Sequence, residues 1–299
     1  MRTREGQLPW GTAALRRRLR DLVAQPGCVV APGCHDALAA RIAQDEGFEA
    51  VYLSGNAASA GLLGRPDIGL AGLYEMTQRA RWVTGAVNVP VIADADAGYG
   101  DAHAIARTVT EFERTGVAAI HIEDQDLPKR CGAMGGVRIV PFDDAVARVR
   151  SALAARTDPD LMIIARTDAL ALGDLDEAVR RAEAFAELGA DLVMVEDVAS
   201  EEQVRALPGL LPGVPLLFDA FEVWPWTVVD TAELDRLGYK VVIMCLSTTL
   251  AYAQAARTVL RAIKDGGSTA DVTGMLMPLA EYERVLGADE FGVGREAGE

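Results

Sequence analysis

Eight short runs of apolar and β-branched residues recur along this chain at intervals of roughly 25 to 40 residues. They lie at 28–33, 50–55, 90–96, 118–124, 161–168, 191–197, 215–221 and 240–246. Runs that are apolar almost throughout are typical of parallel strands buried on both faces. Most gaps between them carry a helical pattern of apolar residues, as 102–116 and 175–190 do. Eight strand–helix units in 299 residues predict an α/β fold of the (β/α)8 type, the TIM barrel.

A doubly wound parallel sheet is the alternative fold for this pattern. That fold expects a glycine-rich phosphate loop after its first strand, and the residues found there, APGCHDAL, lack the GxGxxG spacing. We therefore expect one barrel domain over residues 1–299. Residues 12–24 are expected to form an extra helix that closes the bottom of the barrel, and residues 268–288 to form further helices after the eighth unit.

The charge balance restricts the partners. The sequence holds 44 acidic and 29 basic residues, which gives a formal net charge of −15. Such a surface repels a phosphate backbone, so we expect no nucleic-acid partner and favour a metal cation or a small, neutral or metal-shielded ligand. No run of about 18 uncharged apolar residues occurs, and the start of the sequence lacks the apolar core of a signal peptide. We therefore expect a cytoplasmic protein without a membrane partner.

Polar side chains follow the predicted strands at their C-terminal ends, where the catalytic groups of a TIM barrel gather. They are Ser54, Asp94, Asp96, Glu123, Asp124, Arg166, Asp168, Glu196, Asp197, Asp219 and Glu222. Successive side chains alternate along a strand, so Asp94 and Asp96 share one face, and Glu123 shares a face with His121. If that face is the barrel lumen, three carboxylates converge at its mouth.

Three converging carboxylates would repel one another in a partly dry site, and a divalent cation would remove that repulsion. Oxygen ligands in this number suit Mg²⁺, or Mn²⁺ in its place, which keep several waters and bind through few carboxylates plus substrate oxygens. The alternative interpretation is that strand-end acids cap helices or lie solvated in loops. We prefer that interpretation for Asp101, Asp168 and Asp197.

A long segment after the fourth predicted strand, DQDLPKRCGAMGGVRIV, carries three glycines and no periodicity. Such a loop can hinge and close over a substrate. Lys129 and Arg130 precede Cys131, and neighbouring cations lower a thiol's pKa, so Cys131 is a candidate proton donor or acceptor. No disulfide and no structural zinc are expected, because the four cysteines show neither CxxC pairing nor zinc-ligand spacing: Cys28, Cys34, Cys131 and Cys245.

These segments together resemble the isocitrate lyase/phosphoenolpyruvate mutase superfamily, and its 2-methylisocitrate lyase branch in particular, from about Pro26 to Gly267. The matching segments are YLSGNAASAGLLGRPDIGL (52–70), DADAGYG (94–100), HIEDQ (121–125), PKRCG (128–132), IARTDAL (164–170) and VED (195–197). The resemblance implies a (β/α)8 barrel whose eighth helix is exchanged between neighbouring subunits, in a homotetramer built from dimers.

The resemblance also implies roles for individual residues. Asp94 would be a direct Mg²⁺ ligand, and Asp67, Asp96 and Glu123 would hold the ion directly or through water. The catalytic residues would be Tyr52, Lys129, Cys131, Arg166 and Glu196. Cys131 would protonate the carbanion that leaves on C–C cleavage, and Arg166 would clamp a substrate carboxylate. The residues that contact substrate would be Ser54, Gly55, Asn56, Gly132, Arg166, Asp219 and Phe221.

The chain departs from the lyase pattern at two places. Ala133 stands where the lyases have a histidine after KRCG, and Val137 stands where they have a lysine, with Arg138 beside it. Asp219 and Phe221 occupy the Asn and Thr positions of the segment that binds the second product's carboxylate, and Trp224 and Trp226 follow. An acid beside aromatic residues binds a second carboxylate poorly, so we expect a less charged or more apolar leaving half.

The leading functional hypothesis is therefore an Mg²⁺-dependent C–C lyase, or an aldolase in reverse, acting on a 2-hydroxy acid of the 2-methylisocitrate or alkylmalate type. Pyruvate or glyoxylate would be the 2-oxo acid product. A phosphonomutase and an oxaloacetate-type decarboxylase or hydrolase remain alternatives, because they use the same metal site. A barrel that binds a 2-oxo acid without catalysis is the alternative from another class.

Overall fold

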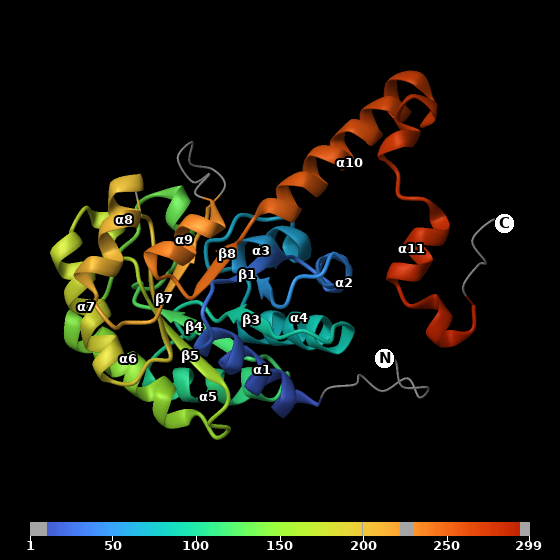
Figure 1. Cartoon of the computed structure of the whole chain (residues 1–299). Coiled ribbons are helices and arrows are strands. Elements are labelled where there is room, and N and C mark those ends of the chain that lie inside the picture. The colour runs from blue at the N-terminus through green and yellow to red at the C-terminus, as the bar shows by residue number, and fades with distance from the viewer. Residues whose placement is uncertain (1–10, 199, 222–229, 294–299) are drawn as a thin grey trace.

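The computed structural model describes residues 11–198, 200–221 and 230–293. Eight parallel strands close into a barrel in chain order, and helices surround it (Figure 1). The strands are β1 (Val29–Cys34), β2 (Val51–Leu53), β3 (Val91–Asp94), β4 (Ala119–Glu123), β5 (Met162–Thr167), β6 (Leu192–Val195), β7 (Leu216–Asp219) and β8 (Val241–Met244). The pairing of Val29 with Val241 closes the ring between β1 and β8. The predicted TIM barrel is confirmed.

The helices fill the intervals in which the sequence shows helical periodicity. They are α1 (Thr12–Ala24), α2 (Ala37–Asp45), α3 (Gly55–Leu63), α4 (Leu73–Ala86), α5 (Ala102–Glu113), α6 (Phe142–Ala155), α7 (Leu175–Glu187), α8 (Glu201–Leu210), α9 (Thr231–Leu237), α10 (Ser247–Gly266) and α11 (Leu279–Val285). Short 3₁₀ helices are η1 (Gly132–Met134), η2 (Ala169–Leu172), η3 (Ala270–Met275) and η4 (Ala288–Phe291). None of the described helices is long and apolar enough to cross a membrane.

Helix α1 lies at the N-terminal ends of the strands, the bottom of the barrel. Its Arg16 is buried and donates from Nε to the carbonyl of Val117, at 2.9 Å, just before β4 begins. The Arg16 guanidinium also pairs with Asp158, at 2.6 Å. These contacts hold α1 across the end of the barrel opposite to the predicted site.

The alternation of side chains along the strands decides which residues face the lumen. The interior is filled by buried side chains that include Tyr52, Ile92, Ile164 and Met194, and burying each such apolar side chain stabilises a fold by about 1.5–3 kcal/mol. Residues two positions further along a strand point the same way. The lumen positions that follow at the top of the barrel are therefore Ser54, Asp94, His121, Glu123, Arg166, Glu196, Asp219 and Cys245.

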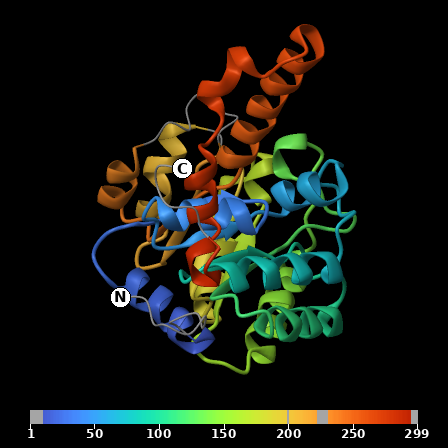
Figure 2. The same ribbon diagram turned by 90° about the vertical axis from the view of Figure 1, so that its right-hand side faces the viewer.

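Helix α10 leaves the barrel instead of covering it (Figures 1 and 2). None of its 20 residues is buried, and its apolar side chains Leu250, Leu260 and Ile263 are exposed. An outer cavity of about 600 Å³ lies between α2 and the start of α10, lined mainly by apolar side chains. Beyond α10 the chain returns, and Arg284 of α11 pairs with Asp45 of α2, at 2.7 Å. The eighth helix thus leaves an apolar face of its own barrel uncovered within one chain.

Candidate active site

A pocket opens at the C-terminal ends of the strands, where the sequence predicts the site. The predicted residues that line it are Tyr52, Ser54, Asn56, Asp67, Asp94, Glu123, Lys129, Cys131, Arg166, Glu196, Asp219 and Phe221. Its interior space is about 30 Å³, roughly the volume of one water molecule. The larger outer cavity beside α2 contains none of these residues. The pocket in this arrangement therefore holds less space than a substrate of several carbon atoms needs.

Asp94, the last residue of β3, is buried and fixed by two backbone amides. Its Oδ2 accepts from the Gly55 N–H at 3.1 Å, and its Oδ1 accepts from the Asp96 N–H at 2.9 Å. A Cβ at position 55 would collide with this carboxylate, so glycine is required for the approach. Burial opposes ionisation of Asp94, but the positive charges of protonated His121, Lys129 and Arg166 outweigh it and lower its pKa to about 2. Asp94 is therefore a fixed anion at the bottom of the pocket.

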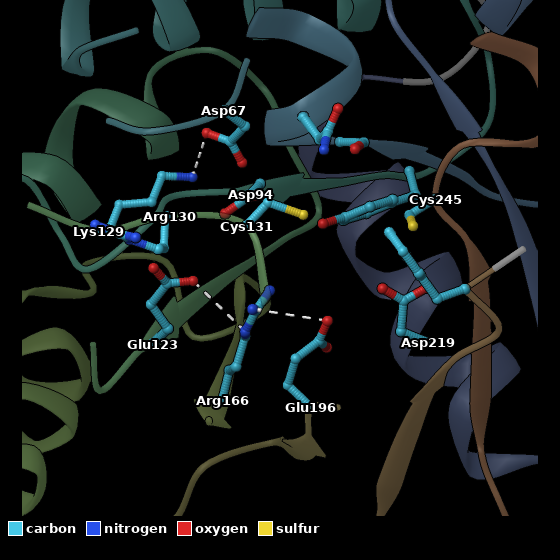
Figure 3. Close-up of a pocket in the computed structure, with 14 residues that line it drawn as sticks. Asp67, Asp94, Glu123, Lys129, Arg130, Cys131, Arg166, Glu196, Asp219 and Cys245 are labelled. Carbon is cyan, nitrogen blue, oxygen red and sulfur yellow. Dashed lines mark ion pairs between the residues drawn. The ribbon is translucent and has the colours of Figure 1, made fainter. Parts of the chain in front are cut away.

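Lys129 lies among the acids that the sequence assigns to a metal. Its Nζ is 2.6 Å from Asp67 Oδ1 (Figure 3). The same ammonium also pairs with Asp96. Burial raises the pKa of Asp96 to about 7, with Asp94 and Asp67 adding to the rise. Burial likewise raises the pKa of Glu123 well above its ordinary value, and Glu123 Oε1 accepts no hydrogen bond from the described residues. Positive charge at this cluster is insufficient for its four carboxylates.

The acids of this cluster offer oxygen donors of the kind that a magnesium ion takes from proteins. Among the described residues, no three acidic, histidine or cysteine side chains are close enough to bind one ion together. Mg²⁺ usually binds through one or two carboxylates and completes its shell with water and substrate oxygens. The unsatisfied oxygen of Glu123 and the fixed anion of Asp94 supply oxygen donors of this type.

Arg166 is held by acids on several sides. Its Nε donates to Asp168 Oδ2 at 2.9 Å and its Nη2 to Asp168 Oδ1 at 2.7 Å. Glu123 and Glu196 lie further away, at 3.5 and 3.7 Å (Figure 3). Burial would lower the pKa of Arg166, but these three acids raise it well above its ordinary value. The guanidinium is therefore a permanent cation in a fixed orientation.

Of the three acids that we interpreted as helix caps or solvated loop residues, two are more buried than that interpretation expects. Asp101 does cap α5, accepting from the backbone N–H groups of His103 and Ala104. The interpretation is wrong for Asp168, which is fully buried against Arg166. It is also wrong for Asp197, a half-buried residue with φ of 57°, whose pKa is raised to about 6 by burial and by Asp168.

His121 is a residue whose contribution the sequence did not reveal. Its Nε2 is 2.7 Å from the Tyr52 hydroxyl, and its Nδ1 is 3.6 Å from Asp94 Oδ1. Burial lowers the pKa of His121 to about 4, so the imidazole is neutral at pH 7. Burial, with Asp94 and Asp219 nearby, raises the pKa of Tyr52 well above its ordinary value. The Tyr52 hydroxyl is therefore protonated. The signal for His121 in the sequence was its place on the same strand face as Glu123.

The loop after β4 covers the acids. Cys131 is half-buried, packs against the lumen residues and donates its backbone N–H to the Asp67 carbonyl at 3.0 Å. A Cβ on Gly132 would collide with the Asp197 carboxylate, so any larger residue at 132 would have to displace that side chain. Val137 is buried while Arg138 is exposed, which suits an apolar residue in place of the lysine. None of the three histidines lines the pocket, so nothing substitutes there for the histidine replaced by Ala133.

The two sides of the pocket differ in character. Figure 3 shows Lys129, Arg130 and Glu123 on one side and Asp219 and Cys245 on the other. Ser54, which lines the pocket, also caps α3 by accepting from the Ala57 N–H at 3.3 Å. Asp219 is half-buried and Phe221 is buried. Trp224 and Trp226 lie outside the described residues.

Comparison with known proteins identifies the family of this site. Residues 19–264 match the model of the phosphoenolpyruvate phosphomutase family. The chain is 38% identical to the 2,3-dimethylmalate lyase of Eubacterium barkeri over 274 residues, which cover 92% of this chain and 94% of that protein. These matches bear out the resemblance found in the sequence segments.

Solved structures share the fold over nearly the whole chain. A structure of oxaloacetate acetylhydrolase with the inhibitor 3,3-difluorooxalacetate has a TM-score of 0.88 and 32% identity, covering 93% of this chain and 95% of that one. Phosphonopyruvate hydrolase in complex with oxalate and Mg²⁺ has a TM-score of 0.83 and 28% identity, covering 92% and 96%. The neighbours thus include enzymes named for different reactions of small oxo acids.

Proposed function

We propose that this chain, which belongs to the phosphoenolpyruvate phosphomutase family, is a metal-dependent carbon–carbon lyase for 2-hydroxy carboxylic acids of the alkylmalate type. One observation carries the proposal. The cysteine of the PKRCG loop lines the same small pocket as Arg166 and Glu196, with the loop backbone bonded to Asp67. A cleavage that releases a carbanion needs an acid next to the leaving carbon. The presence of Cys131 in the pocket supports the lyase assignment, because its thiol can supply that proton.

Binding of the 2-oxo acid half rests on the strand ends. Arg166 is a permanent cation at the pocket wall and would pair with the substrate carboxylate, displacing its longer contacts to Glu123 and Glu196. The protonated hydroxyl of Tyr52 would donate a hydrogen bond to a substrate oxygen. Ser54 and Asn56 border the same space and, with Gly55 between them, would shape it around the small end of the substrate.

Cleavage requires that the substrate hydroxyl lose its proton and that the leaving carbon gain one. Glu196 is buried, and its Oε2 accepts no hydrogen bond from the described residues. Burial raises its pKa well above the ordinary value, so its ionised form is a strong base that would take the hydroxyl proton. The thiol of Cys131 would then deliver a proton to the leaving carbon as the C–C bond breaks.

We further propose that Asp94 binds Mg²⁺, or Mn²⁺, directly, with Asp67, Asp96 and Glu123 holding it directly or through water. When bound, the ion would polarise the oxygen of the forming 2-oxo acid and offset its negative charge. The excess of buried carboxylates over cations at this cluster supports the proposal, as does the Mg²⁺ in the phosphonopyruvate hydrolase neighbour.

The leaving half of the substrate would carry less charge than that of isocitrate. Asp219 and Phe221 border the pocket on the side away from Lys129. A carboxylate placed beside Asp219 would be repelled by the negative charge of that side chain. An alkyl group is accommodated there at lower cost, which favours alkylmalates over isocitrate and methylisocitrate, whose leaving halves both carry two carboxylates.

A test of the proposal is to incubate the protein with Mg²⁺ or with EDTA and a panel of alkylmalates, methylisocitrate, oxaloacetate and phosphonopyruvate, and to follow products by proton and phosphorus NMR. We expect a 2-oxo acid from an alkylmalate only with the metal. Cys131→Ser should reduce kcat by about 100-fold or more. Oxalate and acetate from oxaloacetate would favour the hydrolase alternative, and a new phosphorus resonance would favour the mutase.

We also propose that α10 packs on a neighbouring subunit, in a homotetramer. Helix α10 has no buried residue, and the cavity beside α2 is lined mainly by apolar side chains. Both support this arrangement, because packing against a neighbouring subunit would cover both apolar surfaces. Four chains of 31.8 kDa would give about 127 kDa in light scattering after size-exclusion chromatography. A monomer of 31.8 kDa at micromolar concentration would contradict the exchange.

A further inference from the structure

Gln125 is a buried polar residue that the mechanism above does not use. It follows Glu123 by two residues, just after β4, and only 1% of it is exposed. Its side-chain Oε1 accepts from the Arg130 N–H at 3.0 Å, and its Nε2 donates to the Arg130 carbonyl at 2.9 Å. One side-chain amide thus pairs with one loop peptide in both directions, as a neighbouring strand would.

The peptide that Gln125 holds lies between two residues of the pocket. Arg130 is flanked by Lys129 and Cys131, and both line the site. Because Arg130 itself is exposed, its own side chain does not bury this part of the loop. The position of the Arg130 backbone, fixed by Gln125, therefore determines where the ammonium and the thiol on either side are placed.

The same amide also reaches the arginine of the pocket. Gln125 Nε2 is 3.1 Å from Asp168 Oδ1, and this oxygen accepts from Arg166 Nη2 at 2.7 Å. A continuous series of hydrogen bonds therefore runs from the loop peptide through Gln125 and Asp168 to Arg166. An amide can complete it because the amide both accepts and donates, which a carboxylate or an apolar side chain cannot do.

The remaining contacts of the loop divide into a base and a tip. At the base, Gln125 and Ile139 form an isolated antiparallel bridge, and the Asp126 N–H donates to the Arg138 carbonyl at 2.8 Å. At the tip, Lys129 and the Cys131 N–H contact Asp67. The Gln125 side chain joins the base to the tip, because Gln125 belongs to the base and its amide binds the Arg130 peptide at the tip.

We propose that Gln125 is a positioning residue that holds the loop over the pocket, in register with Arg166, so that Cys131 faces the leaving carbon. This inference rests on the proposed function for its catalytic part, whereas the loop position itself can be measured without turnover. Gln125 touches no substrate; it acts through the Arg130 peptide and through Asp168.

The test uses the full-length protein and two substitutions of similar volume. Gln125→Met removes all three side-chain hydrogen bonds. Gln125→Glu keeps the acceptor for the Arg130 N–H but places a carboxylate oxygen against Asp168 Oδ1 and the Arg130 carbonyl. The control is Arg138→Ala, which removes an exposed bond to the Leu127 carbonyl and an exposed ion pair with Asp126 in the same loop but none of the Gln125 bonds.

Loop position is read from the rate at which iodoacetamide alkylates Cys131, resolved by mass spectrometry, with the half-buried Cys28 as internal reference. Two neutral hydrogen bonds hold the loop peptide, so we expect about ten-fold faster alkylation of Cys131 in Gln125→Met. Gln125→Glu should be faster still, because repulsion is added. Cys28 should react at the wild-type rate in every variant, and Arg138→Ala should leave Cys131 unchanged.

Turnover gives the second measurement. With an alkylmalate, Gln125→Met should lower kcat by about ten-fold while KM changes by less than about three-fold, because Arg166 keeps its bidentate contact to Asp168. An unchanged alkylation rate of Cys131 in Gln125→Met overturns the positioning role. A milder effect of Gln125→Glu than of Gln125→Met overturns it too, since the amide donor to Asp168 and to the Arg130 carbonyl would then be unnecessary. If Gln125→Glu fails to fold, Gln125→Met alone decides.

Failure of the proposed function would look different. If the wild type cleaves no 2-hydroxy acid but alkylation follows the expected order, the lyase assignment falls and the positioning of the loop by Gln125 stands. If the wild type cleaves alkylmalate and the Gln125 variants match it in both measurements, the positioning role falls and the lyase assignment stands.

Discussion

Asp168→Asn is the substitution whose effect follows most directly from the geometry of the pocket. Asp168 accepts two charge-assisted hydrogen bonds from Arg166, at 2.7 and 2.9 Å, and one from Gln125 at 3.1 Å. Asparagine keeps one oxygen in this place and puts an amino group where the other stood. A buried N–H donor of Arg166 then faces a donor instead of an acceptor.

Two effects of opposite sign follow from this change. Loss of one hydrogen bond to a charged group costs about 1.5–3 kcal/mol. Loss of the negative charge also relieves repulsion, because Asp168 raises the pKa of Glu123, Asp124 and Glu196. The relief acts over longer separations than the direct contact, and the remaining acids stay 3.5 and 3.7 Å from Arg166. The direct loss wins, and we expect unfolding free energy to fall by about 2 kcal/mol.

The assay is urea unfolding at pH 7 and fixed protein concentration, together with the KM of the preferred substrate. KM should rise by about ten-fold, because Arg166 is free to turn towards Glu123 and Glu196. Asp101→Asn is the matched control: Asp101 is an exposed cap of α5, and asparagine caps equally well, so neither quantity should change. Wild-type stability and wild-type KM in Asp168→Asn would refute the role given to this contact.

Three further substitutions test other parts of the site. Burial raises the pKa of Asp197 in the folded protein from 3.8 to about 6. The stability that the protonated carboxyl allows is therefore present below pH 4 and lost as pH rises through 6. Asp197→Asn should stabilise the protein by on the order of 2 kcal/mol at pH 8 and not at pH 4, in urea titrations at both pH values. Gly132→Ala should lower kcat by about ten-fold or more, since its Cβ would meet the Asp197 carboxylate, whereas Gly209→Ala, in open space on α8, should leave kinetics unchanged. Mg²⁺ at one hundred times its Kd should stabilise the wild type by about 2.7 kcal/mol and so raise its melting temperature. Asp94→Asn should abolish this rise, and an equal rise in both proteins would remove Asp94 from the metal site.

The barrel could be predicted because its strands are buried on both faces. Their near-continuous apolar runs are visible in one sequence, and the alternation of side chains places Asp94, Glu123 and Arg166 in the lumen. Five predicted strands ran two residues past the observed C-terminal ends, those of β2, β3, β6, β7 and β8. β3 stops at Asp94 and β6 at Val195, because Asp96 and Asp197 have φ of 48° and 57°, outside the extended region.

The second layer of the site could not be predicted, because it depends on contacts between distant segments. Gln125 meets Asp168 across 43 positions of sequence, and no periodicity connects them. His121 lies on the expected strand face, but its bond to Tyr52 depends on the width of the lumen. The outward course of α10 could be expected only from the family resemblance, since a helix that covers its own barrel and one that leaves it show the same apolar spacing.

Cleavage in D₂O tests the central claim most directly. The preferred alkylmalate is incubated with the protein and Mg²⁺ in D₂O, and the products are followed by proton NMR. We expect a 2-oxo acid and a carboxylic acid in equal amounts, with one deuterium on the carbon that leaves, and no reaction in EDTA or with Asp94→Asn. A 2-oxo acid formed at the same rate without the metal, or no C–C cleavage of any alkylmalate, would contradict the account.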